Sequence, residues 1–134
     1  MQTNAEVGLY LDASALVKLV VPERETDALT AFVGRQGVLT SSSLARVEVM
    51  LAVRQHGAAA IATGRSLVEQ LDLVQLDDEL LDMAAGIDMP LRSLDAIHVA
   101  SALELGDTLE AFVTYDVQMT RAANALGLPV AAPA

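Results

Sequence analysis

Short apolar blocks alternate with longer amphipathic stretches along the whole chain. The first block, residues 7–11, is apolar at consecutive rather than alternate positions, which is typical of a strand buried on both faces of a sheet. Similar blocks predict strands at residues 38–40, 73–76 and 111–115, and a short last strand at residues 128–131. The pattern therefore predicts a sheet of four to five short strands.

Between these strands, apolar residues recur every three to four positions, which predicts helices. They are expected at residues 14–21, 25–36, 44–55, 58–71, 94–105 and 117–126, and a further helix is expected to begin near Asp77 and to lie before Pro90. Strands that alternate with helices predict an α/β fold whose parallel sheet is covered on both faces. We expect a single domain over residues 1–134, with the first strand at its centre.

The composition predicts a folded protein of the cytoplasm. Apolar residues make up 53% of the 134 positions and the mean hydropathy is +0.42, which excludes a disordered chain. No apolar run reaches the roughly 18 residues that a membrane span needs, and the first residues lack the features of a signal peptide. The absence of cysteine excludes disulfides and thiolate metal sites. We therefore expect a cytoplasmic enzyme or binding protein with no membrane contact.

Two aspartates directly follow predicted strands. Asp12 comes after the first strand, and Asp116 comes after the strand at residues 111–115. Helix capping is a sufficient explanation for each of them, because a carboxylate at such a position accepts hydrogen bonds from the free N–H groups of the next helix. The carboxyl ends of parallel strands, however, also meet at the edge where α/β proteins bind ligands. The two aspartates can therefore reach one site.

Two further acids lie in helices that are otherwise apolar. The neighbours of Glu48 one turn away are apolar, and an unpaired carboxylate in such a place costs on the order of several kcal/mol. An ion pair with Arg46 or Arg54 would also explain it. Asp95 lies at the start of a helix, where the helix dipole favours an acid.

Together, these four acids can form one pocket: Asp12, Glu48, Asp95 and Asp116. Four ionised carboxylates repel one another unless a counter-charge is present. Mg²⁺ or Mn²⁺ would supply that charge, since both prefer oxygen ligands, and either can activate water and stabilise a phosphoryl group. Metal-assisted hydrolysis of a phosphodiester bond is the leading chemical hypothesis.

The charges of the chain do not determine which residues would contact a nucleic acid. A net charge of −10, from 18 acidic and 8 basic residues, argues against binding through bulk electrostatics. With two phenylalanines, two tyrosines and no tryptophan, a base-stacking platform is not expected. Four basic residues lie near the candidate acids in sequence, and either orient them or contact RNA phosphates: Lys18, Arg46, Arg92 and Arg121.

The two histidines do not indicate a different chemistry. His98 either bonds Asp95, three residues before it, or is a satisfied core residue, which is the commoner case. His56 is expected to be exposed at a helix end. The zinc-protease, P-loop, dinucleotide and serine-hydrolase motifs are absent from the sequence.

Four segments resemble the motifs of the PIN-domain family, in the family's order and approximate spacing. Residues 11–18, LDASALVK, resemble the first motif and residues 47–49, VEV, the second. Residues 91–100, LRSLDAIHVA, are similar to the third motif of the VapC toxins of toxin–antitoxin pairs, and this match is the most specific. Residues 113–116, VTYD, with the alanines and glycine that follow, resemble the fourth. The resemblance covers nearly the whole chain.

The resemblance implies a small three-layer α/β/α domain that acts as an Mg²⁺-dependent or Mn²⁺-dependent endoribonuclease. It implies that the four acids are the catalytic residues and metal ligands, and that the hydroxyls of Ser14 and Thr114 support them. It also implies a homodimer, a VapB-like antitoxin that covers the acidic groove, and a tRNA or rRNA loop as substrate.

Two other functions fit parts of the sequence less well. The chain could be a catalytically weak PIN-like binding module that acts through an antitoxin and operator DNA, although keeping all four acids favours an enzyme. An aspartyl-phosphate phosphatase ranks lower, because Ser14 stands two residues after Asp12, where that chemistry favours a second acid.

Overall fold

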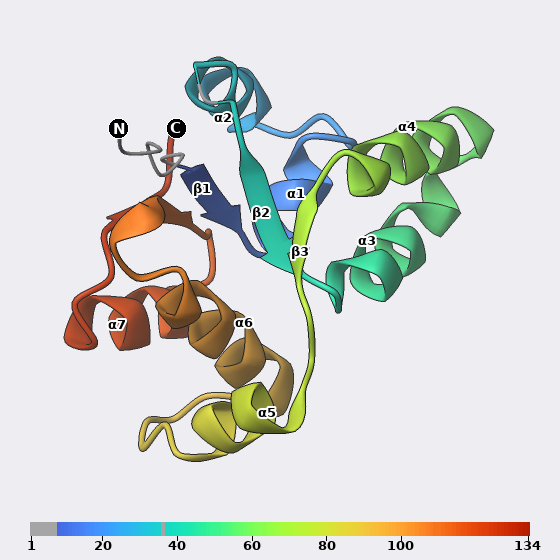
Figure 1. Cartoon of the computed structure of the whole chain (residues 1–134). Helices are drawn as coiled ribbons and strands as arrows, with labels where there is room; N and C mark the ends of the chain where they lie inside the picture. Colours follow the sequence, from blue (N-terminus) through green and yellow to red (C-terminus); the bar gives the residue numbers. More distant parts are fainter. Residues whose placement is uncertain (1–7, 36) are drawn as a thin grey trace, which may run out of the picture.

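A five-stranded parallel sheet runs through the centre of the computed structural model, which describes residues 8–35 and 37–134 (Figure 1). The strands are β1 (Gly8–Leu11), β2 (Leu39–Ser42), β3 (Asp72–Val74), β4 (Leu109–Val113) and β5 (Val130–Ala131). They are arranged in the order β3-β2-β1-β4-β5. The parallel sheet and the central position of β1 are therefore confirmed.

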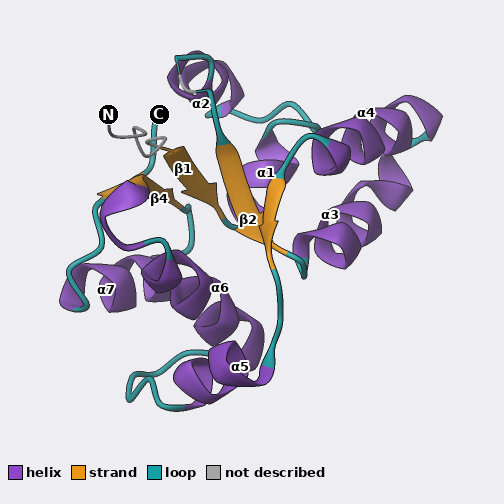
Figure 2. Ribbon diagram, in the orientation of Figure 1, coloured by secondary structure: helices purple, strands orange, loops and turns teal. Residues whose placement is uncertain are grey.

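Helices cover both faces of this sheet (Figure 2). They are α1 (Ala13–Lys18), α2 (Thr26–Val33), α3 (Ala45–Val53), α4 (Ala58–Glu69), α5 (Asp78–Ala85), α6 (Ser93–Glu104) and α7 (Val117–Ala125), with short 3₁₀ turns at Arg54–His56 and Gly106–Thr108. The core on one face draws on α1 to α4 and the core on the other face on α6 and α7, while α5 packs on α6. This is the predicted three-layer arrangement. Among the described helices, none is long and apolar enough to cross a membrane.

The side chains of β1 divide between the two cores. Leu9 and Leu11 pack on the side of α1 to α4, whereas Tyr10 packs on the side of α6 and α7. Tyr10 is paired in register with Phe112 of β4, and their rings stack with centroids 5.5 Å apart. All four side chains are fully buried, and burying each one stabilises the fold by roughly 1.5–3 kcal/mol. The central strand is thus anchored from both sides.

Several element boundaries differ from the predicted ones for identifiable reasons. Strand β4 ends at Val113 instead of residue 115, because the Tyr115 N–H donates to the Ser14 hydroxyl and not to a neighbouring strand. Helix α6 begins at Ser93, so Arg92 takes the capping position and Ser93 does not cap the helix. The predicted first strand and second helix each include residues, at positions 7 and 36, that lie outside the described ranges.

Helices α3 and α4 approach closely at Gly64, which is buried. A Cβ atom at this position would lie 3.2 Å from Val53 Cγ2 and 3.6 Å from Val49 Cγ1. Both valines are fully buried, so they have little freedom to move away. The absence of a side chain at Gly64 therefore sets the distance between the two helices.

Replacing Gly64 with leucine should lower the free energy of unfolding by about 1–3 kcal/mol, because the added atoms overpack this contact. Urea denaturation followed by circular dichroism measures the change. Ala62→Leu, at an exposed position of the same helix, is the matched control and should change stability by less than about 0.5 kcal/mol. Equal stability of the two variants would contradict the close packing.

Candidate active site

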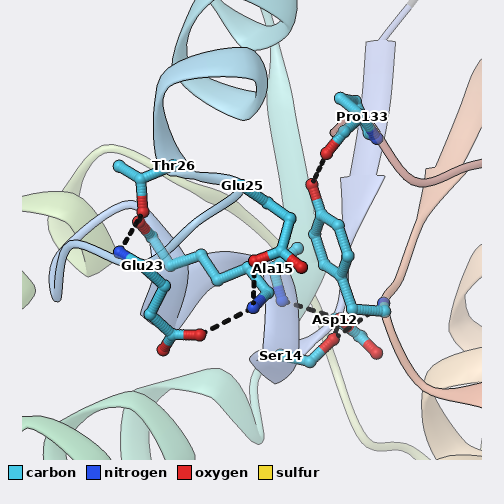
Figure 3. Close-up of polar contacts among 9 residues, drawn as sticks. Asp12, Ser14, Ala15, Glu23, Glu25, Thr26 and Pro133 are labelled. Carbon is cyan, nitrogen blue, oxygen red and sulfur yellow. Dashed lines mark hydrogen bonds and ion pairs between the residues drawn. The ribbon is translucent and has the colours of Figure 1, made fainter.

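The carboxylate of Asp12 lies at the end of the central strand and is fully buried. Its Oδ1 accepts hydrogen bonds from the backbone N–H of Ala15 (3.0 Å) and the hydroxyl of Ser14 (2.7 Å), as Figure 3 shows. Its Oδ2 accepts a hydrogen bond from the hydroxyl of Thr114 at 2.5 Å. Asp12 therefore caps α1, the simpler of the two explanations for its position, and both of its oxygens have donors.

Burial dominates the electrostatics of this carboxylate. Removal from water raises the pKa of Asp12 above its usual range, and the hydrogen bonds from Ser14, Thr114 and Ala15 offset this only in part. Among the described residues, no lysine or arginine forms an ion pair with it. The buried charge thus depends mainly on neutral hydrogen-bond donors, with a smaller stabilising contribution from the nearby His98, and a bound cation would stabilise it further.

Two hydroxyls connect Asp12 to the end of β4. Besides donating to Asp12, the Thr114 hydroxyl accepts a hydrogen bond from the Asp116 N–H (3.0 Å), and the Ser14 hydroxyl accepts one from the Tyr115 N–H (3.1 Å). Asp116 in turn caps α7 by accepting from the Met119 N–H at 2.7 Å. The structure therefore brings Asp12 and Asp116 to the same edge of the sheet, through Thr114.

Glu48, on α3, is bonded to a histidine and not to an arginine. Its Oε1 lies 2.7 Å from Nε2 of His98, and its side chain is 20% exposed. The suggested ion pair with Arg46 or Arg54 is wrong, because neither arginine is among the described ion-pair partners of Glu48. His98 is a satisfied core residue, as favoured, but its carboxylate partner is Glu48 and not Asp95.

On its other side, the His98 ring contacts the central strand. Nδ1 lies 2.7 Å from the hydroxyl oxygen of Tyr10, and both side chains are buried. Sequence reasoning did not identify Tyr10 as part of the site. The histidine ring stands out on the apolar face of α6 in the same way as the carboxylate of Glu48 does on α3, so the sequence did contain a signal for His98. The sequence alone did not show that Tyr10 is its partner.

The basic residues near the acids in sequence have different partners in space. The Arg92 guanidinium donates to Asp95 at 3.4 Å, so it contacts one of the candidate acids. Lys18 instead bonds to Glu23 and Glu25, at 2.7 and 3.0 Å, and lies over the ring of Tyr115.

The other two basic residues, Arg46 and Arg121, form no described ion pair with a candidate acid. Arg46 lines a pocket of about 440 Å³ between α3 and α4 with Arg54 and Arg65, and Arg121 is exposed on α7. Of the four, only Arg92 therefore has the predicted role of orienting an acid.

The chemistry of the donor set fits a hard divalent cation. Ser14 and Glu48 line one groove of about 470 Å³, and Ser14 is bonded to Asp12. Carboxylate oxygens suit Mg²⁺ and Mn²⁺, and the buried Asp12 has no lysine or arginine partner in the part of the chain that the structure describes. Within the described ranges, however, no three or more carboxylates and histidines are arranged to hold a metal ion. Glu48 and Asp95 are engaged with partners of their own, so the four-acid metal site stays a prediction.

Comparison with known proteins gives a consistent result. The family model of the PIN domain matches residues 9–125. Ribonuclease VapC46 of Mycobacterium tuberculosis is 46% identical over 126 residues, which cover 93% of this chain and 97% of that protein.

Solved structures show the same fold. The crystal structure of M. tuberculosis VapC20, described as a toxin that cleaves the sarcin–ricin loop, superposes with a TM-score of 0.72 at 14% identity, over 93% of this chain and 99% of that one. A toxin–antitoxin complex from Klebsiella pneumoniae contains a chain that superposes with a TM-score of 0.69 at 17% identity, over 94% and 98%.

The raised pKa of Asp12 predicts that removing the charge of this carboxylate stabilises the metal-free protein, by an amount that depends on pH. Above that pKa the metal-free wild-type protein holds a buried charge that Asp12→Asn removes, so in EDTA the melting temperature of the variant should gain on that of the wild type as the pH rises through the raised pKa. This gain should be lost as the pH falls through the raised pKa, because the wild-type carboxyl then becomes neutral as well. Calorimetric scans between pH 7 and pH 4 test this, with the exposed Asp107→Asn as control. A difference in melting temperature that does not change with pH would contradict burial as the main influence on this carboxylate.

Proposed function

The chain belongs to the PIN domain family, in which it is related to the VapC ribonucleases, and we propose that it is a metal-dependent endoribonuclease. We propose further that it is the toxin of a VapBC-like toxin–antitoxin pair. One structural observation supports this most strongly: a fully buried carboxylate, Asp12, which pairs with no lysine or arginine among the described residues, lies at the carboxyl end of the central strand and is linked to Asp116 through Thr114. A named ribonuclease that is 46% identical over almost the whole chain supports the RNA substrate.

In this proposal, Asp12, Glu48, Asp95 and Asp116 together hold Mg²⁺ or Mn²⁺ and are the catalytic acids. Such an ion activates water and stabilises negative charge on a phosphoryl group. The hydroxyls of Ser14 and Thr114 hold the Asp12 carboxylate in one orientation, with its charge stabilised by hydrogen bonds.

The substrate contacts must come from local positive charge. The side chain of Arg92 is 84% exposed while it bonds Asp95, so it can reach an RNA phosphate beside the acids. Lys18 is held by two glutamates, so the net charge of this group is negative and does not favour RNA. We propose a tRNA or rRNA loop as substrate, since VapC20, which shares this fold, is described as a toxin that cleaves the sarcin–ricin loop.

The proposal includes two protein partners in the cytoplasm. A VapB-like antitoxin is supported by the toxin–antitoxin complex that shares this fold. A homodimer is supported by Val47 and Leu51, which lie one turn apart on α3 and are 59% and 53% exposed. Large apolar side chains that are exposed together on one helix face mark a protein interface.

Asp95→Asn should reduce RNA cleavage by more than about 100-fold, because the loss of a metal ligand exceeds the 10–100-fold effect of an outer-shell change. Sequencing of RNA 5′ ends after incubation of total RNA with the purified protein measures cleavage. EDTA should abolish the activity of the wild type, and Mg²⁺ or Mn²⁺ should restore it.

Asp107→Asn, which changes an exposed acid outside the site, should keep wild-type activity and provides the matched control. Cleavage that survives in Asp95→Asn would rule out the proposed reaction. Tight RNA binding without metal-dependent cleavage would instead favour the binding-module function.

Leu51→Glu should convert the dimer to a monomer, because it places a charge in the proposed apolar interface. Analytical ultracentrifugation measures the mass. Leu126→Glu, on the last turn after α7, is a matched control at another exposed leucine and should leave the dimer intact. A wild-type protein that sediments as a monomer at micromolar concentration would contradict this interface.

A further inference from the structure

Three side chains from three different elements form a continuous hydrogen-bonded chain. The hydroxyl oxygen of Tyr10, on β1, lies 2.7 Å from His98 Nδ1, and His98 Nε2 lies 2.7 Å from Glu48 Oε1. Tyr10 and His98 are 0% and 1% exposed, so their polar atoms depend on protein partners and not on solvent. The chain runs from the buried centre of the sheet to a partly exposed carboxylate on α3.

The direction of the second hydrogen bond follows from the chemistry of its two ends. An ionised carboxylate only accepts hydrogen bonds, so His98 Nε2 must bear a proton that it donates to Glu48. This holds for the neutral ring, whose Nδ1 then accepts from the Tyr10 hydroxyl, and equally for the charged ring, whose Nδ1 donates to Tyr10. In both cases the ring has a partner on each nitrogen, and neither nitrogen is available as a metal ligand.

Packing holds the ring in the orientation that this contact needs. Tyr10 is stacked on Phe112 at a centroid distance of 5.5 Å, and the His98 ring meets Tyr10 edge-on at 5.9 Å and 74°. Tyr10 is also fixed by the register of β1 and β4. The position of the histidine is therefore determined by contacts with the buried centre of the sheet.

We propose that Tyr10 and His98 are a positioning pair that fixes the carboxylate of Glu48 for metal binding. Glu48 Oε1 is committed to His98, whereas Oε2 has no hydrogen-bond partner among the described residues, so one oxygen is left for the ion. This inference rests on the proposed function, because it assigns Glu48 to the metal site.

A structural role explains why the buried His98 needs an acceptor for its Nε2 proton, but not why that acceptor is a partly exposed acid in the groove. A carboxylate that is 20% exposed can be hydrated, so Glu48 does not need the histidine to satisfy it. Glu48 also lines the same groove as Ser14, which is bonded to Asp12. The contact therefore orients an acid toward the groove beside Asp12, which is what an outer-shell partner of a metal ligand does.

The test is the affinity of the full-length protein for Mn²⁺, measured by electron paramagnetic resonance titration. Tyr10→Phe removes only the hydroxyl and keeps the ring stack, and His98→Leu removes the donor to Glu48. Each should weaken Mn²⁺ binding by about 10-fold or more. His98→Gln keeps an N–H donor and should recover part of the affinity that is lost in His98→Leu.

Matched controls exist for both residues. Thr108→Val removes a hydroxyl away from the groove, which donates to the carbonyl of Leu105, and His56→Leu replaces the exposed histidine. Both should bind Mn²⁺ within about twofold of the wild type, a difference too small to register as a lost interaction. In a Glu48→Gln background, His98→Leu should cause no further loss, because its effect acts through Glu48.

The outcomes separate this inference from the proposed function. If the wild type binds Mn²⁺ and cleaves RNA but folded Tyr10→Phe binds Mn²⁺ equally well, the positioning pair is refuted and the function stands. An undiminished loss from His98→Leu in the Glu48→Gln background also refutes it. If the wild type binds no Mn²⁺ and its RNA cleavage survives Asp95→Asn, the proposed function fails, and the inference fails with it. Should His98→Leu not fold, Tyr10→Phe decides alone.

Discussion

The burial of one carboxylate at the end of the central strand constrains the rest of the site. Asp12 has no contact with water, and an isolated charge in such a place would cost several kcal/mol or more. Its three donors come from the first turn of α1 and from the residue after β4. They can all reach it only if β1 and β4 are neighbours and α1 begins directly after β1. The strand order and the capping of α1 are thus requirements of the same buried charge.

The same edge of the sheet lets opposite layers of the protein meet. Glu48 lies on α3, which packs on one face of the sheet, whereas His98 lies on α6, which packs on the other. Helix layers on opposite faces are too far apart for direct side-chain contact through a sheet. Their 2.7 Å contact therefore has to lie around an edge of the sheet, where β1 ends at Asp12. A parallel sheet with a central reversal of strand order provides such a place.

The periodicity of the sequence was sufficient to predict the fold, but the hydrogen-bond partners of the site residues could be identified only from the three-dimensional structure. The apolar blocks and the helical repeats predicted the parallel sheet and the central β1, because burial on both faces leaves a strong local signal. Glu48 was identified because a carboxylate on an apolar helix face is conspicuous. Its bond to His98 joins residues that are 50 positions apart, and no local rule distinguishes that histidine from the nearer Arg46 and Arg54. The end of β4 was misplaced for a related reason, since a side chain distant in sequence, Ser14, takes its N–H.

The buried polar residues show where the chain departs from the rules of a simple core. Most of them lie at or just beyond the ends of β1, β2 and β4, or on α6: Asp12, Thr40, Ser41, Ser42, His98, Ser101 and Thr114. Within the described residues, none of their buried side-chain atoms lacks a hydrogen-bond partner. A fold that needed only stability could fill these positions with apolar side chains at little or no cost. Asp12, His98 and Thr114 among them belong to the candidate site, where satisfied buried polar groups are the expected departure from a simple core.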